Sequence, residues 1–60
     1  MNVKLGLKKV VWKDEDRTKV IRGDTIIDEF YVIVTPKNQG AFWINREAII
    51  VIKDAGDYND

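Results

Sequence analysis

The chain has 60 residues, which is enough for one small domain with a single core. It contains no cysteine, histidine or serine, which excludes disulfides, the usual thiolate and imidazole metal ligands, and the commonest nucleophiles and general bases. Ten basic residues balance ten acidic ones, and a zero net charge argues against a general nucleic-acid coat. We therefore expect a protein that is not an enzyme and that holds no metal or other cofactor.

The sequence also bears on location and assembly. No stretch approaches the roughly 20 apolar residues of a transmembrane helix, and the first residues lack the apolar run of a signal peptide. Together with the absence of cysteine, this predicts a soluble cytoplasmic protein without a membrane partner. A chain this short buries only about 60% of the surface that it exposes when unfolded, so support from a homo-oligomer is expected.

Two long strands are predicted in the first half of the chain. From Val3 to Trp12 apolar side chains alternate with lysine and glycine, and a break of phase at Lys9-Val10 predicts a bulge. The polar residues 13–16 predict a turn. A second strand is expected over Arg17–Ile27, and Gly23 in its middle indicates a sharp bend.

Three shorter strands are predicted in the second half. Phe30–Thr35 has the strongest β composition and is apolar on both faces, so it should be central. The only proline opens a turn over residues 36–40. Ala41–Ile44 is expected to be a strand, Asn45–Ala48 a single 3-10 turn, and Ile49–Ile52 the last strand.

These elements predict an all-β protein: a five-stranded, strongly bent antiparallel barrel with one short 3-10 turn before the last strand. The barrel is expected to span residues 1–53, and the acidic residues 54–60 are expected to form a flexible tail. The third and fifth strands carry more apolar surface than one small core can bury. One edge or face is therefore expected to pack against a second copy.

Two stretches resemble the motifs of the Sm-like family, which includes bacterial Hfq and is built on an SH3-like barrel. The run Gly23–Val34, a glycine and an aspartate followed by an apolar strand, is similar to the first Sm motif. The run Ile44–Ile52, a short polar turn and Ala-Ile before the last strand, is similar to the second. The resemblance covers about Val20–Lys53. It implies a ring-forming barrel that binds RNA, with Arg46 in the turn that lines the pore.

Basic residues crowd the first 22 positions, which hold seven of the ten. Trp12 lies among them, and a basic strand with an aromatic residue can hold phosphates and stack a base, although Trp12 could instead fill the core. Because side chains alternate along a strand, one of Phe42 and Trp43 must point away from the core. The same alternation applies to the neighbours Phe30 and Tyr31, so Tyr31 is also a candidate for an exposed aromatic residue. The candidate nucleic-acid-binding residues are Lys8, Lys9, Lys13, Arg17, Lys19 and Arg46, and the candidate exposed or interface aromatics are Trp12, Tyr31 and Trp43.

Two kinds of function remain open at this point. The first is a small oligomerising Sm-like barrel that binds RNA or single-stranded DNA. The alternative is an SH3-like module that binds a protein partner, or a structural subunit, for instance of a phage or mobile-element assembly. Lysines gathered on one face beside an aromatic residue would favour nucleic acid, whereas lysines scattered among acidic residues would favour the protein module.

Overall fold

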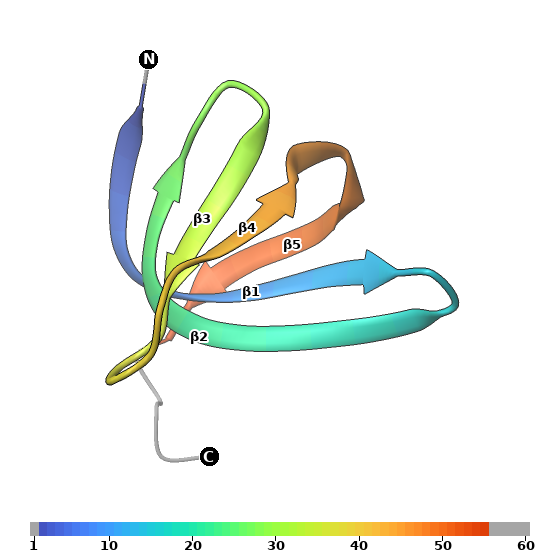
Figure 1. Ribbon diagram of the computed structural model, residues 1–60, viewed down its shortest axis with the longest axis horizontal. Helices are drawn as coiled ribbons and strands as arrows, with labels where there is room; N and C mark the ends of the chain where they lie inside the picture. Colours follow the sequence, from blue (N-terminus) through green and yellow to red (C-terminus); the bar gives the residue numbers. More distant parts are fainter. Residues whose placement is uncertain (1, 56–60) are drawn as a thin grey trace.

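The structure is a computed structural model that describes residues 2–55 (Figure 1). Its strands form one antiparallel sheet in the order β4-β3-β2-β1-β5. This confirms the predicted all-β class with five antiparallel strands and a 3-10 turn before the last strand. The sheet stays open, because β4 and β5 form its two opposite edges. The elements are β1 (Val3–Asp14), β2 (Arg17–Ile27), β3 (Tyr31–Thr35), β4 (Phe42–Asn45), the 3-10 turn η1 (Arg46–Ala48) and β5 (Ile49–Asp54).

The strands β1 and β2 pair along their whole length as one long, curved hairpin. Leu5 is an extra residue in the ladder, and the following Gly6 has a φ of +81°, a left-handed conformation that glycine adopts without strain. The predicted bulge at Lys9-Val10 is therefore wrong. The second irregularity falls on β5 at Ile50, where β1 continues without interruption.

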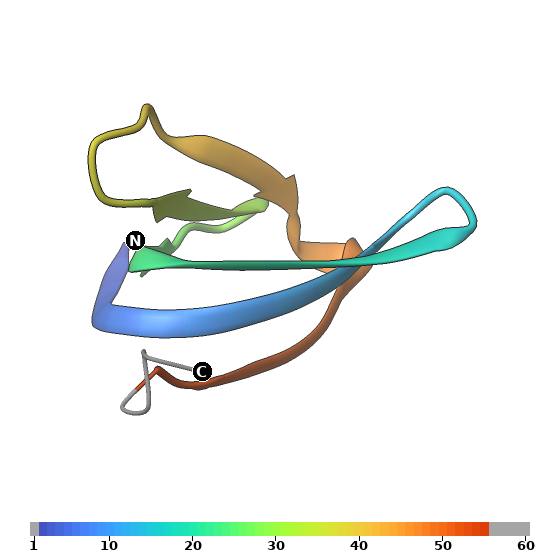
Figure 2. The same cartoon turned by 90° about the horizontal axis from the view of Figure 1, so that it is seen from below.

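The tip of this hairpin is shorter than predicted. The sequence suggested a turn over residues 13–16, but β1 continues to Asp14, which lies opposite Arg17, and only Glu15 and Asp16 form the loop. Figure 2 shows the hairpin projecting beyond the other strands. Side chains on the projecting part of the hairpin have no strand opposite them across the core.

The bend in β2 occurs where the predicted glycine lies. Gly23 lies very close to the end of the neighbouring strand β3. A Cβ atom placed on it would lie 2.6 Å from the carbonyl oxygen of Thr35. Two residues later the buried hydroxyl of Thr25 donates a hydrogen bond to the carbonyl oxygen of Gly23, at 3.0 Å. The close approach and this hydrogen bond fix the corner of the sheet.

One face of the curved sheet forms the core. Val10, Val32, Val34 and Ile44 are buried there, because alternate residues of β1, β3 and β4 point to the same side. Figure 2 shows β3 and β4 on one side of this core and β1 and β5 on the other. The half-buried residues packed around it are Trp12, Ile21, Ile27, Ile49 and Ile52.

The described part of the chain ends just after β5. The tail predicted over residues 54–60 begins with Asp54, which is the last residue of β5, and Ala55 is buried. Residues 56–60 lie outside the described range. Between residues 2 and 55, no helix is long and apolar enough to cross a membrane.

Candidate functional site

A groove of about 660 Å³ opens between the projecting β1–β2 hairpin and β4. It is a continuation of the core, left uncovered because the sheet does not close on that side. Its apolar lining comes from the β1–β2 hairpin and from the consecutive elements β4 and η1, which lie far from the hairpin in the sequence. These lining residues are Trp12, Val20 and Ile21 of the hairpin, Phe42, Trp43 and Ile44 of β4, and Ala48 of η1.

The structure settles how the predicted aromatic residues point. Trp12 is half-buried, so it both packs on the core and lines the groove. Of the two neighbours in β4, Phe42 lies on the core-facing side opposite Val34, and Trp43 lies on the outer side with 62% of its surface exposed. Tyr31 meets Trp43 edge to face, with ring centroids 5.4 Å apart and planes at 71°. Tyr31 and Trp43 therefore form one aromatic pair on the outer face.

Two of the predicted basic residues are held in ion pairs. Lys19 lies opposite Trp12 at the rim of the groove, and its Nζ is 2.9 Å from Oδ2 of Asp14. The hydrogen bond with Asp14, and then the charge of Asp14, raise the pKa of Lys19. Lys8 pairs with Asp54 and so joins β1 to β5. Both lysines are therefore matched by an acidic neighbour.

The ion pair of Lys8 and Asp54 can be tested by measuring the pKa of Asp54. The hydrogen bond from Lys8, followed by its positive charge, lowers the pKa of Asp54 below the ordinary value of 3.8. Because the folded pKa is lowered, the pair stabilises the fold above the ordinary pKa, and this contribution is lost as the pH falls through the folded pKa. NMR titration should show Asp54 of the wild type titrating below 3.8, and Lys8→Gln should raise its pKa.

The control for this titration is Lys4→Gln, which removes an exposed lysine elsewhere on β1. It should leave the pKa of Asp54 unchanged. An Asp54 that titrates at the same pH in the wild type and in Lys8→Gln would contradict the pairing.

A second, smaller hollow of about 290 Å³ lies between the β2–β3 loop and η1. Arg46 holds the two segments together. Its backbone N–H donates to the carbonyl oxygen of Phe30 at 3.0 Å, and its Nη1 lies 3.3 and 3.4 Å from the carbonyl oxygens of Asp28 and Glu29. Glu29 and Glu47 line the same hollow, so its acidic side chains outnumber the one arginine. This surplus of negative charge opposes phosphate binding there.

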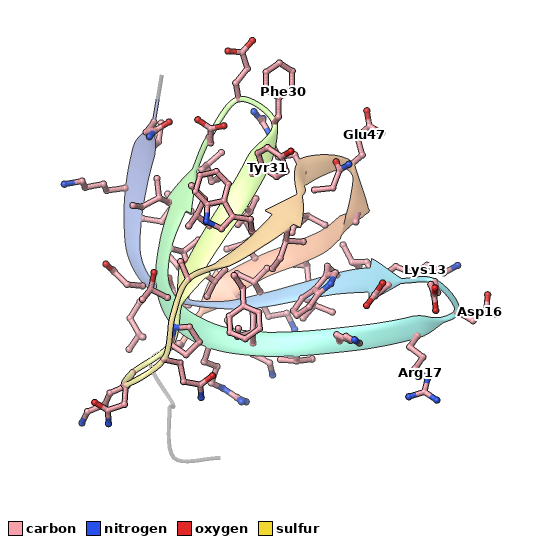
Figure 3. All side chains as sticks on the ribbon, viewed as in Figure 1. Lys13, Asp16, Arg17, Phe30, Tyr31 and Glu47 are labelled. Atoms are coloured by element: carbon pink, nitrogen blue, oxygen red, sulfur yellow. The ribbon has the colours of Figure 1, made fainter. Side chains whose placement is uncertain are left out.

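The structure does not gather the six predicted nucleic-acid-binding residues. By strand alternation Lys8, Arg17 and Lys19 lie on the core-facing side, while Lys9 and Lys13 lie on the outer side. Figure 3 shows Lys13 and Arg17 at the hairpin tip, well away from Phe30, Tyr31 and Glu47, which lie around the second hollow with Arg46. The basic residues are thus divided between two faces and two ends of the molecule.

The acidic residues at the hairpin tip do not form a metal site. Within residues 2–55, no three acidic side chains come close enough together to hold a metal ion. Asp14, Glu15 and Asp16 follow one another in the sequence, but Asp14 is turned toward Lys19 and Asp16 lies at the end of the loop (Figure 3).

The two edges of the sheet are unusually apolar for edges that face solvent. β4 contains no charged residue, and Trp43 on it is largely exposed. β5 is apolar from Ile49 to Ile52, and Ile50 at its bulge is 57% exposed. Proteins that remain monomeric usually protect such edges with charges, proline or a covering loop. Among residues 2–55, the outward backbone groups of both edges have no strand partner and lie next to exposed apolar side chains.

Sequence reasoning missed three residues that the fold makes relevant. Phe42 was seen only as a neighbour of Trp43, although it forms a wall of the groove. Arg22 and Lys53 were not singled out, although the register places both beside Lys9. Only the pairing of the strands brings them together, because Lys9, Arg22 and Lys53 are separated by up to 44 residues in the chain.

Comparison of the chain with models of protein families, with curated proteins and with solved structures finds no match. The resemblance to the Sm-like family therefore stays a prediction that rests on the residues of the two motifs.

Proposed function

We propose that the protein is a protein-interaction domain that assembles with copies of itself, β4 of one copy pairing with β5 of the next. The observation that supports this most is the pair of open, apolar edges. Strand addition at a free edge satisfies the unpaired backbone groups, and the neighbouring side chains provide specificity. The formation of a ring, which the Sm-like resemblance implies, is consistent with such an assembly.

The pairing of unlike edges is favoured over the pairing of like edges. A dimer built from two β4 edges would leave both β5 edges bare, and a dimer built from two β5 edges would leave both β4 edges bare. Contacts between β4 and β5 cover every edge when the assembly closes into a ring. A strand added to β4 also lies beside Phe42, at the wall of the groove. It would therefore cover part of the apolar surface that the open sheet leaves exposed.

The distribution of basic residues favours a protein partner over RNA as the main ligand. Lys8 and Lys19 are paired with acidic side chains, and Arg46 is bonded to backbone carbonyl groups beside two glutamates. Lys8 and Lys19 do not lie on the face that carries the Tyr31–Trp43 pair. RNA binding through the six predicted residues thus stays a prediction with little support from the geometry.

A mixing experiment tests the assembly. Trp43→Lys places a charge on β4 alone, and Ile50→Lys places one on β5 alone. Light scattering should give the wild type a mass several times the 7.0 kDa of the chain, and each variant the mass of a monomer. Mixed in equal amounts, the two variants should form a species of twice the chain mass, because each retains one intact edge.

Leu7→Lys is the matched control, because Leu7 is about as exposed as these two residues but lies on β1, outside the two strands that would pair in the assembly. It should leave the mass unchanged. Two variants that had merely unfolded would not combine when mixed. A monomeric wild type would refute the assembly, and a variant that still assembles with itself would refute the pairing of unlike edges.

A further inference from the structure

The outer face of the sheet carries a row of three basic residues that the sequence does not reveal. Lys9 of β1 lies directly opposite Arg22 of β2 on one side and directly opposite Lys53 of β5 on the other. Residues that face each other across antiparallel strands point to the same side of the sheet, with Cβ atoms about 5 Å apart. We call Arg22, Lys9 and Lys53 the cation row. It spans about 10 Å, or two strand spacings.

Like charges directly opposite one another destabilise a sheet, so the row lowers the stability of the fold. Within residues 2–55 neither Lys9 nor Lys53 has an ion-pair partner, in contrast to Lys8 and Lys19. Among the described residues, the nearest acidic residue on the same face is Asp24, two positions along β2 from Arg22 and opposite Leu7 rather than Lys9. Arg22 already takes part in another interaction, so the positive charge available to a ligand comes mainly from Lys9 and Lys53.

The surroundings of the row fit a linear, negatively charged ligand. Val20, Val11 and Val51 form the next row along the outer face, and beyond them Lys13 lies opposite Thr18. This surface offers charge across three strands, and in the described part of the chain the apolar neighbours of the row are only Leu7 and the three valines, too small an area to anchor in a bilayer. A line of charges across the strands suits a ligand whose phosphate groups follow one another along a chain.

We propose that the cation row binds the phosphate backbone of single-stranded nucleic acid. The three residues of the site come from one copy of the chain, so the site is complete without the proposed assembly, although Lys53 lies on the β5 edge. Lys9 is its centre because it lies opposite both other members of the row in the register. The row makes no contact with bases that would select a sequence, so binding should be largely independent of sequence.

Fluorescence anisotropy with a labelled oligothymidylate tests the site over a range of salt concentrations. The logarithm of the wild-type binding constant should fall linearly with the logarithm of the salt concentration. In the variant Lys9→Gln/Lys53→Gln, this slope should become less steep by about 0.7 for each phosphate contact that is removed. The variant should remain folded and melt no lower than the wild type at low salt, because the substitutions relieve the repulsion between like charges.

The matched control is Lys4→Gln/Lys37→Gln, which removes the same charge from two exposed positions outside the row. It should keep the wild-type salt dependence. Equal losses in the two double variants would show that only net charge matters and would overturn the proposal. A wild type that does not bind the oligonucleotide at low salt would also overturn it. So would equally tight, row-dependent binding of polyglutamate or of anionic lipid vesicles, which would assign the row to another partner.

Discussion

Gly23→Ala should destabilise the protein by about 3 kcal/mol, at the upper end of the usual cost of overpacking. The added methyl group would lie 2.6 Å from the carbonyl oxygen and 2.7 Å from the carbonyl carbon of Thr35, and 2.8 Å from the nitrogen of Pro36. All three are backbone atoms, so no flexible side chain can move away. A domain of this size has a total stability of roughly 3–9 kcal/mol, so the loss is a large part of the whole.

Gly40→Ala is the matched control. A methyl group added to Gly40 would have no neighbouring atom within 4 Å, and the φ of this residue lies outside the left-handed region. Alanine at such a position should be neutral or should stabilise by about 0.4–1 kcal/mol, because it restricts the unfolded chain. Urea unfolding of both variants at one protein concentration provides the measurement. Similar free energies of unfolding for the two variants would refute the close approach of β2 and β3.

Ile44→Ala should cost about 2–5 kcal/mol. Ile44 is only 6% exposed and belongs to the core cluster, opposite Val32 across β3 and β4. The substitution removes its contacts with that cluster and leaves a cavity that a small, open sheet cannot easily close. The groove that Ile44 helps to line should widen at the same time.

The control for this substitution is Leu7→Ala, which deletes the same number of carbon atoms from a residue that is 50% exposed. Its cost should stay below about 1 kcal/mol, as is usual for surface positions. Thermal or urea unfolding separates the two variants. If Leu7→Ala were as costly as Ile44→Ala, the core would lie on the opposite face of the sheet from the one described.

The sequence allowed a good prediction of the strands, since local patterns specify them. The second strand was predicted over about Arg17–Ile27, which the structure confirms, because a polar loop and an acidic break bound it on either side. The glycine at the corner was also identified from its place in that strand. The 3-10 turn could be predicted because Asn45–Ala48 interrupts the β composition, and Asn45 indeed caps it by accepting the N–H of Glu47 at 2.9 Å.

What the sequence could not supply depends on contacts between distant segments. Phe42 and Trp43 are equally apolar, so only the pairing of β4 with β3 determines which of them faces outward. Arg46 has the chemistry of a phosphate ligand, and only the fold shows its bonds to carbonyl groups 17 and 18 residues away. The cation row is invisible for the same reason, because register alone brings Lys9 beside Lys53.

The order of the strands has a consequence for how the chain folds during synthesis. Four strands pair with a neighbour that immediately precedes or follows them in the chain, but β5 pairs with β1 at the opposite end of the sequence. Closing so long a loop costs entropy that no local contact offsets in advance. Until residues 49–54 leave the ribosome, β1 is itself an edge. Val10, the centre of the finished core, then lacks its partner Ile52. The nascent domain therefore passes through a stage with an unprotected strand, which is the stage at which it is most exposed to aggregation.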